Sequence, residues 1–231
     1  MRSSDGGPID LSRPSAYGVI GRLLVGLLLL FPASAFARGA VVHHQLNVTL
    51  HPETHQVTAT DTFTIPGKGD HACFRLASEA TVSELTVDGK RVDFSFHDGR
   101  LCVPLPSAKA ARQPSRVVVS YSAVFDDPVP DNPVHSEDPS YGVTATVRPE
   151  GTLLLGGAGW YPRLPHGEAT FTLQARAPAG DQAATVGKCR VRRTDQESSV
   201  SVWDIGIPCA GLALSAGPYV ITEQQVGDTP V

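Results

Sequence analysis

The pentapeptide HPETH at 51–55 contains the residue types of a zinc site, two histidines and a glutamate. A zinc peptidase helix carries H-E-x-x-H, which places both histidines on one face and the general base beside the first. Here the glutamate is two positions after His51, about 200° around a helix, so it would point away from a shared metal. In an extended segment, His51 and His55 would stand roughly 13 Å apart, too far for zinc–nitrogen bonds of about 2.0–2.1 Å. Because strand-forming residues flank the motif, we predict a proline-containing hairpin turn and no metal site.

The glycine-rich stretch 153–162 (LLLGGAGWYP) is similar in composition to a phosphate-binding loop. A dinucleotide fingerprint needs G-x-G-x-x-G at the start of a helix, but Pro162 occupies the third glycine position and strand-like residues follow. We therefore attribute these glycines to a bulge or to a close approach between backbone segments. Trp160 and Tyr161 are interpreted as core or inter-domain packing residues rather than as a ligand platform.

The segment 211–217 (GLALSAG) is close to the nucleophile elbow G-x-S-x-G, with Ala213 at the first glycine position and Ser215 as the serine. In an elbow a helix follows the serine directly, whereas residues 218–221 (PYVI) have a strand pattern, so we assign no serine hydrolase. His43 and His44 are adjacent and therefore face opposite sides of a strand. No other grouping of Asp, Glu, His or Cys indicates a catalytic set, so we expect no catalytic residue, no metal ligand and no cofactor.

Most of the sequence around these residues has the residue pattern of β-strands. Asp88-Gly89 and Asp98-Gly99 indicate tight hairpins, because both central positions of a type I′ turn need positive φ. One helical turn at most is predicted, at 107–113. The fold class is therefore all-β, an antiparallel β-sandwich of two packed sheets. Strands are predicted within 43–50, 56–65, 91–99, 116–125, 169–175, 199–207 and 218–224.

One insert, 126–142 (DDPVPDNPVHSEDPSYG), interrupts this pattern. Its four prolines exclude a helix and a central strand. We interpret it as a solvated surface loop, because its acidic residues lack the D-x-D-x-D-G spacing of a calcium loop. Those five carboxylates belong to Asp126, Asp127, Asp131, Glu137 and Asp138.

Residues 1–37 have the pattern of a secretory signal peptide. Arg22 precedes the apolar run 23–31, and the small-residue pattern A-F-A at 35–37 precedes Arg38. The run is too short for a membrane helix, which needs about 20 apolar residues. We therefore expect export to the periplasm or the extracellular space, with 38–231 as a single domain and no membrane association after cleavage. The formal net charge of −4 and the absence of a basic run give no reason to expect nucleic acid as a partner.

All four cysteines, Cys73, Cys102, Cys189 and Cys209, follow the expected cleavage site. An even number of cysteines in an exported chain indicates disulfides. Of the three possible pairings we favour Cys73–Cys102 with Cys189–Cys209, because each pair falls within one local group of strands. Free buried thiols remain the alternative, because the sequence alone does not fix the geometry.

The order of these pieces resembles the N-terminal β domain of the M1 family of zinc aminopeptidases, in its bacterial branch. The resemblance covers nearly all of 38–231 and implies a saddle-shaped β-sandwich, which in that family precedes a thermolysin-like catalytic domain. It rests on the segments 46–67, 85–94, 116–128, 153–165, 169–188 and 211–223.

The catalytic motifs of that family, G-x-M-E-N and H-E-x-x-H, do not occur in this sequence. The family pattern T-Q-x-E…F-P-C-x-D-E-P is also absent. Glu150 lies in the corresponding neighbourhood but matches no motif, so no substrate-binding residue is transferred. We expect an exported non-catalytic domain, either a truncated or split peptidase or a docking partner of an M1-type catalytic domain. The alternative is an extracellular binding module for protein or carbohydrate, for which exposed Trp160 and Trp203 would form the platform.

Overall fold

The computed structural model describes residues 41–66, 70–105, 114–130, 142–165, 167–222, 225–226 and 229–230. The expected signal peptide (1–37) and the single helical turn expected at 107–113 lie outside these ranges. Within them the regular elements are strands, apart from one 3₁₀ turn, η1 (Pro52–Thr54). No helix in this part of the chain is long and apolar enough to cross a membrane.

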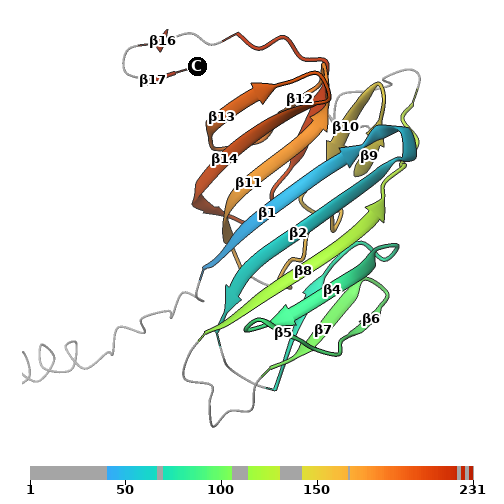
Figure 1. Ribbon diagram of the computed structural model, residues 1–231, viewed down its shortest axis with the longest axis vertical. Helices are drawn as coiled ribbons and strands as arrows, with labels where there is room; N and C mark the ends of the chain where they lie inside the picture. The colour runs from blue at the N-terminus through green and yellow to red at the C-terminus, as the bar shows by residue number, and fades with distance from the viewer. Residues whose placement is uncertain are drawn as a thin grey trace, which may run out of the picture. The chain divides into compact units, whose positions relative to one another are not determined.

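The largest element is an eight-stranded sheet with the order β13-β14-β11-β1-β2-β8-β4-β5 (Figure 1). Its strands are β1 (Val42–His51), β2 (Gln56–Ile65), β4 (Thr81–Val87), β5 (Lys90–Arg91), β8 (Ser115–Val124), β11 (Ala169–Pro178), β13 (Lys188–Thr194) and β14 (Ser198–Cys209).

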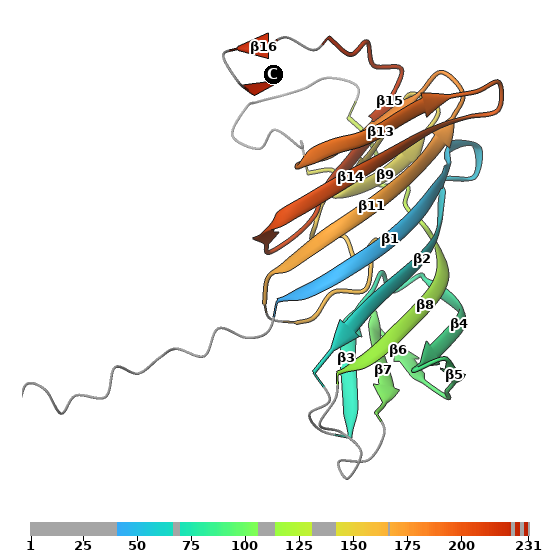
Figure 2. The same ribbon diagram turned by 60° about the vertical axis from the view of Figure 1, so that its left-hand side comes forward.

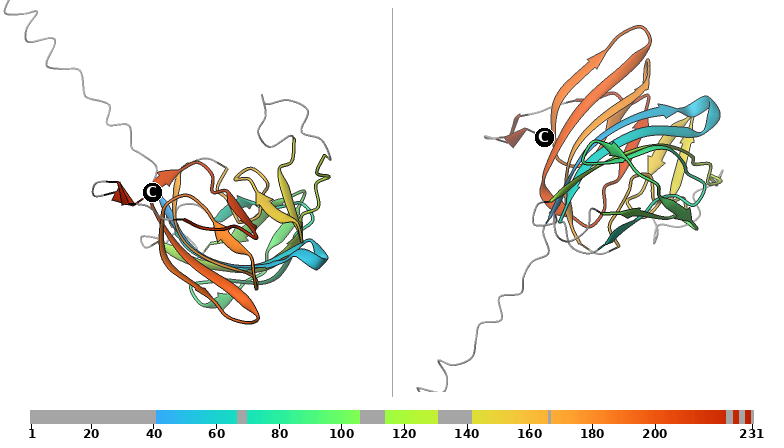
Figure 3. Two further views of the ribbon diagram at one scale, coloured as in Figure 1. Left: turned by 90° about the horizontal axis from the view of Figure 1, so that it is seen from above. Right: turned by 60° about the horizontal axis from the view of Figure 1, so that its bottom comes forward.

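Two smaller sheets pack on one face of the large sheet, as the turned views show (Figures 2 and 3). One has the order β12-β15-β10-β9 and the other β3-β7-β6, and β16 and β17 form a separate pair. The bounds are β3 (His71–Arg75), β6 (Ser95–His97), β7 (Arg100–Pro104), β9 (Ala145–Arg148), β10 (Gly151–Leu154), β12 (Gln182–Ala184), β15 (Leu214–Gly217), β16 (Gln225–Val226) and β17 (Thr229–Pro230).

One continuous core lies between the large sheet and the small ones. Along β1 and β2 the buried residues alternate with exposed or half-buried ones, as expected for strands with one face covered. Phe63 on β2 contacts Phe74 on β3 with ring centroids 5.0 Å apart, and Leu154, Leu173 and Trp160 are fully buried in the same cluster. The all-β sandwich predicted from the sequence is confirmed.

The pairing of β1 with β11 departs from the purely antiparallel arrangement that we predicted. The two strands run parallel, with Val42 opposite Ala169 and Thr49 opposite Arg176, so the large sheet is mixed. A parallel pair needs a long crossover connection, and here the chain between the two strands supplies β2 to β10.

Both predicted tight hairpins are present. Asp88 and Gly89 have φ values of 51° and 77° between β4 and β5, and Asp98 and Gly99 have 49° and 70° between β6 and β7. A Cβ on Gly99 would lie 2.6 Å from the carbonyl oxygen of Leu76, so this position also needs glycine for space.

The prediction of a strand from residue 218 is wrong. After β15 the chain at 218–222 pairs with no strand in the part that the structure describes, and Val220 is 94% exposed. The β-branched pattern was present, but apolar residues form a strand only where a neighbouring strand and a covered face are available.

The cysteines follow the predicted pairing in one case only. Cys73 and Cys102 are directly opposite on β3 and β7, with Cα atoms 4.1 Å apart, and form a disulfide. The Cys189–Cys209 pairing is wrong, and both thiols are free. Cys189 is opposite Trp203 on β14, and Cys209 lies six residues further along β14, about 20 Å away at 3.4 Å per residue.

Candidate functional site

The HPETH segment forms the hairpin that was predicted, between β1 and β2. Residues 52–54 form η1, and His55 closes the turn with φ of 54° and an N–H bond to the carbonyl of Pro52. His51 Nε2 is hydrogen-bonded to Thr58 Oγ1 at 2.9 Å, whereas His55 Nδ1 donates to the carbonyl of Val147 at 2.8 Å. The two imidazoles are therefore hydrogen-bonded to different residues and share no common partner. Nowhere in the described ranges do three or more His, Cys, Asp or Glu side chains gather as a metal site.

The glycine-rich stretch is a place of close backbone approach, as predicted. A Cβ on Gly156 would lie 2.8 Å from the Cα of Gly211, and one on Gly159 would lie 2.6 Å from the amide nitrogen of Ala77. No helix follows the glycines. These residues bring the segment before Trp160 against two other loops, and they do not build a phosphate cradle.

Trp160 and Tyr161 are core residues, as interpreted from the sequence. Trp160 is fully buried, and its Nε1 donates to the carbonyl of Leu212 at 3.1 Å. The Tyr161 hydroxyl accepts a hydrogen bond from the backbone N–H of Leu212, and the Tyr121 hydroxyl donates to the carbonyl of Trp160. Trp203 is also buried, so neither tryptophan offers a platform for a ligand. This removes the feature on which the binding-module alternative depended.

Ser215 lies in the middle of β15, opposite Leu153 on one side and Ala184 on the other. Its hydroxyl donates to the carbonyl of Ala184 at 3.4 Å. A nucleophile elbow needs the serine at a sharp turn between a strand and a helix, and that local geometry is absent at Ser215. Glu150, the other residue singled out from the sequence, is exposed in the turn between β9 and β10.

The two described carboxylates of the 126–142 insert are engaged by the fold. One carboxylate oxygen of Asp127 accepts hydrogen bonds from the Thr144 hydroxyl and from the backbone N–H groups of Thr144 and Ala145. These bonds lower the pKa of Asp127. Asp126 pairs with Arg148. The other three carboxylates, those of Asp131, Glu137 and Asp138, lie outside the described residues.

A buried polar pair, which sequence reasoning missed, lies inside the core. His44 on β1 and Asp61 on β2 are joined by Nδ1 and Oδ2 at 2.6 Å, and both are almost completely buried. The imidazole lies between the rings of Phe63 and Phe171, with centroids 4.9 and 5.1 Å away. Burial raises the pKa of Asp61 although the neighbouring His44 opposes this, and the second carboxylate oxygen, Oδ1, has no hydrogen-bond partner.

The His44–Asp61 pair has the composition of a catalytic dyad but no space for a substrate. The cavity beside His44 has a volume of about 30 Å³, enough for a single water molecule. The residues facing it include Tyr161 and Cys209, and burial raises the pKa of the Cys209 thiol, which disfavours the nucleophilic thiolate. The pair is therefore a structural element of the core.

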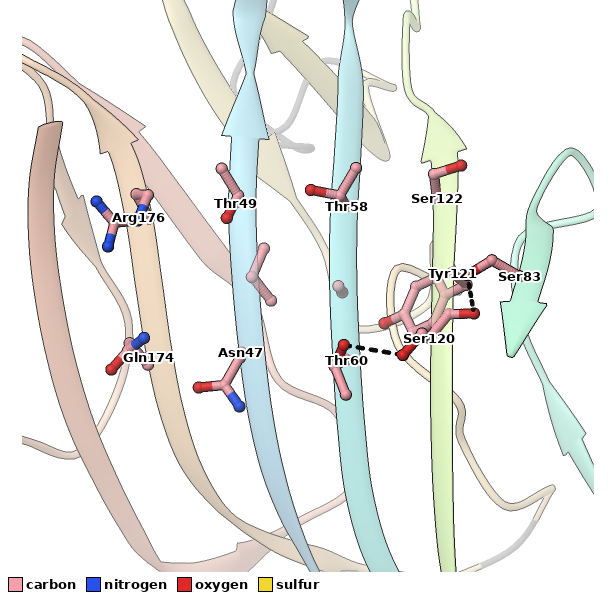
Figure 4. Close-up of a pocket in the computed structure, with 12 residues that line it drawn as sticks. Asn47, Thr49, Thr58, Thr60, Ser83, Ser120, Tyr121, Ser122, Gln174 and Arg176 are labelled. Atoms are coloured by element: carbon pink, nitrogen blue, oxygen red, sulfur yellow. Dashed lines mark hydrogen bonds between the residues drawn. The ribbon is translucent and has the colours of Figure 1, made fainter. Parts of the chain in front are cut away.

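The outer face of the large sheet carries an open polar depression of about 440 Å³ (Figure 4). The Thr60 and Ser120 hydroxyls are hydrogen-bonded at 3.0 Å, and the Ser83 hydroxyl donates to the carbonyl of Ser120. Asn47, Gln174 and the Thr and Ser side chains around them supply amides and hydroxyls, but the lining contains no carboxylate, imidazole or thiol. Thr58, one of the lining residues, carries the hydroxyl that is hydrogen-bonded to His51 Nε2 at 2.9 Å.

Comparison with known proteins identifies the fold. No protein-family model and no curated protein sequence matches the chain. Among solved structures, the M1 zinc metallopeptidase of Deinococcus radiodurans superposes with a TM-score of 0.61 at 20% identity, over 84% of this chain and 46% of that one. Leukotriene A4 hydrolase from Saccharomyces cerevisiae superposes with a TM-score of 0.55 at 15% identity, over 88% of this chain and 34% of that one.

The chain has the fold of the M1 N-terminal β domain. The resemblance inferred from the order of the sequence segments is thereby confirmed at the level of the fold. The chain spans less than half of each of these M1 structures. At this level of identity the match identifies an architecture, and activity does not follow from it.

Proposed function

We propose that this chain is an exported, non-catalytic domain of the M1 N-terminal type that acts by binding an M1-type catalytic domain. The observation that carries this proposal is the likeness of 84% of the chain to 46% of an M1 zinc metallopeptidase, at its N-terminal β domain. The reactive groups in the described part support it: the histidines of the 51–55 hairpin, Ser215 and the His44–Asp61 pair are each engaged in structural contacts.

The catalytic part of the proposal is tested with the purified full chain, Zn²⁺ and an aminoacyl-anilide substrate. The expected result is no release of aniline above a metal-only control. Zinc-dependent turnover that survives repurification and disappears in a His51→Ala/His55→Ala variant would overturn the proposal.

The partner and export parts are tested separately. The mature protein recovered from the host should begin at Arg38, because the expected cleavage follows Ala37. The tagged chain should retain a protein that carries H-E-x-x-H, and the two purified proteins should bind each other again. A mature N-terminus upstream of the apolar run 23–31 would contradict the expected cleavage, and recovery of the chain in the cytoplasmic fraction would refute export.

A further inference from the structure

The β13 edge of the large sheet carries an unusual concentration of positive charge. This strand contains Lys188, Arg190, Arg192 and Arg193, and nothing pairs with its outer edge in the described part of the chain. Arg190 is neutralised by Asp204, with a nitrogen–oxygen distance of 2.5 Å. None of the ion pairs among the described residues involves the other three.

Arg192 is held in a fixed position. It lies opposite Ser201 on β14, and its guanidinium carbon is 5.8 Å from the centre of the Trp203 ring. One terminal nitrogen is 3.8 Å from the Cys189 sulfur, a weak acceptor. The Nε atom is buried and has no hydrogen-bond partner. A buried donor without a partner is unfavourable, and more so on a charged group, so the protein itself satisfies this guanidinium incompletely.

An open pocket of about 540 Å³ lies beside this guanidinium. Arg192 and Arg193 alternate across the edge strand, and both line the pocket, which therefore wraps around the edge. Its other walls come from Gln182 and from the irregular segment after β15. Among the described residues, the lining offers cationic, amide and hydroxyl donors and no carboxylate: Gln182, Arg192, Arg193, Thr194, Tyr219 and Ile221.

Exposed apolar residues adjoin the positive wall. Tyr219, Val220 and Ile221 are consecutive and are 47%, 94% and 40% exposed. A guanidinium fork beside an exposed apolar stretch fits a ligand with a carboxylate and apolar groups on the same chain. A free inorganic anion would use the first feature and leave the second exposed to water.

We propose that this pocket binds an acidic, partly apolar segment of a protein partner, with one carboxylate held by Arg192 and apolar side chains placed against Tyr219 and Ile221. The inference rests on the proposed function, because it names the surface and the chemistry by which the domain recognises its partner.

A labelled hexapeptide, N-acetylated and C-amidated Glu-Leu-Glu-Leu-Glu-Leu, serves as the probe, and its binding to the full chain is measured by fluorescence polarisation. The same peptide with Gln in place of Glu should bind about tenfold more weakly or worse, because it lacks the charge-assisted bond. Arg192→Met should weaken binding of the Glu peptide by a similar factor. Arg192→Lys keeps the charge and loses the planar fork, so it should also weaken binding.

Arg190→Met is the matched control, because it removes the same charge from the same strand at a residue already paired with Asp204. Its binding should stay within about twofold of the wild type, since exposed charges that are already paired contribute little. An equal loss of peptide affinity in Arg190→Met and Arg192→Met, or no binding by the wild type, would overturn the proposal that this pocket binds the peptide. So would a dimer of the chain that dissociates on Arg192→Met, because the occupant would then be a second copy. Unfolding midpoints in urea confirm that each variant is folded.

The failure of this inference is distinguishable from failure of the proposed function. A catalytic partner that binds the Arg192→Met chain as tightly as the wild type overturns the pocket and leaves the proposed function standing. Peptide binding that depends on Arg192, together with zinc-dependent turnover by the chain alone, supports the pocket and overturns the proposed function.

Discussion

The two faces of the central strands β11, β1, β2 and β8 carry opposite chemistry on the same backbone. The inner face is buried and apolar, with Leu46, Phe63, Val119 and Leu173 among its residues. The outer face is covered with hydroxyl and amide groups, including the Thr60–Ser120 pair (Figure 4). Successive side chains of a strand point to opposite faces of the sheet, so neighbouring residues meet different surroundings. A polar side chain on the outer face is solvated, whereas one on the inner face needs a hydrogen-bond partner in the core.

The largest effect that tests this comparison comes from the buried pair on the inner face. Asp61→Ala should destabilise the domain by about 3–5 kcal/mol, because His44 would keep its buried position without its partner. The double variant His44→Leu/Asp61→Leu should recover most of this loss, since both polar groups are then replaced by apolar ones. Urea unfolding measures all three proteins. A double variant as unstable as Asp61→Ala would show that the loss comes from packing around the site.

Two adjacent residues on β11 give the next comparison. Leu173 is fully buried, and Gln174 lies on the outer face. Leu173→Ala should cost about 2–5 kcal/mol through lost burial and the cavity it leaves, whereas Gln174→Ala should change stability by about 0.5 kcal/mol or less. The difference between the urea unfolding midpoints of these two variants measures how differently the two faces of the sheet contribute to stability. Similar values for both would contradict the assignment of the faces.

The smallest effect is a dependence on pH. Burial raises the pKa of Asp61 from its ordinary value of 3.8. As the pH rises above that value, the unfolded chain releases the proton while the folded chain keeps it, so the free energy of unfolding falls with rising pH until the folded group ionises. Asp61→Asn lacks this proton. The stability of the wild type relative to Asp61→Asn should therefore decrease between pH 4 and the raised pKa.

That comparison cancels carboxylates such as Asp127 and Asp195, whose lowered pKa values give the opposite slope in both proteins. A relative stability that is constant or increases over this range would show that Asp61 is ionised in the fold throughout.

The long alternating strands and the tight hairpins could be predicted from the sequence. Both depend on residues that are close together in the chain: the alternation of apolar and polar residues in the strands and the Asp-Gly pairs in the turns. The strand β13 was missed because its sequence, KCRVRRT, has no apolar alternation; it is held by β14 at an exposed edge. The segment 218–221 had the pattern of a strand but no partner. Partners depend on residues far away in the sequence, and a local pattern does not contain them.

The buried His44–Asp61 pair left a signal that could have been used. In β1 the inward positions are Val42, His44, Leu46, Val48 and Leu50, and His44 is the single polar residue among them. Asp61 is the single charged residue at the inward positions of β2. When two strands joined by one hairpin each carry a polar residue at a buried position, the two polar side chains are expected to contact each other. The cysteines show the limit of this reasoning, because Cys189 and Cys209 share one pair of strands but their register keeps them apart.

The parallel insertion of β1 against β11 has a consequence for the order in which the molecule is completed. The strand made early in synthesis acquires one neighbour, β2, almost at once, but its other neighbour begins at Ala169. Until the ribosome has released that part of the chain, one edge of β1 stays open to other strands. The large sheet therefore reaches its final topology only after β11 has been made, and holdase chaperones would have access to this edge of β1 until then.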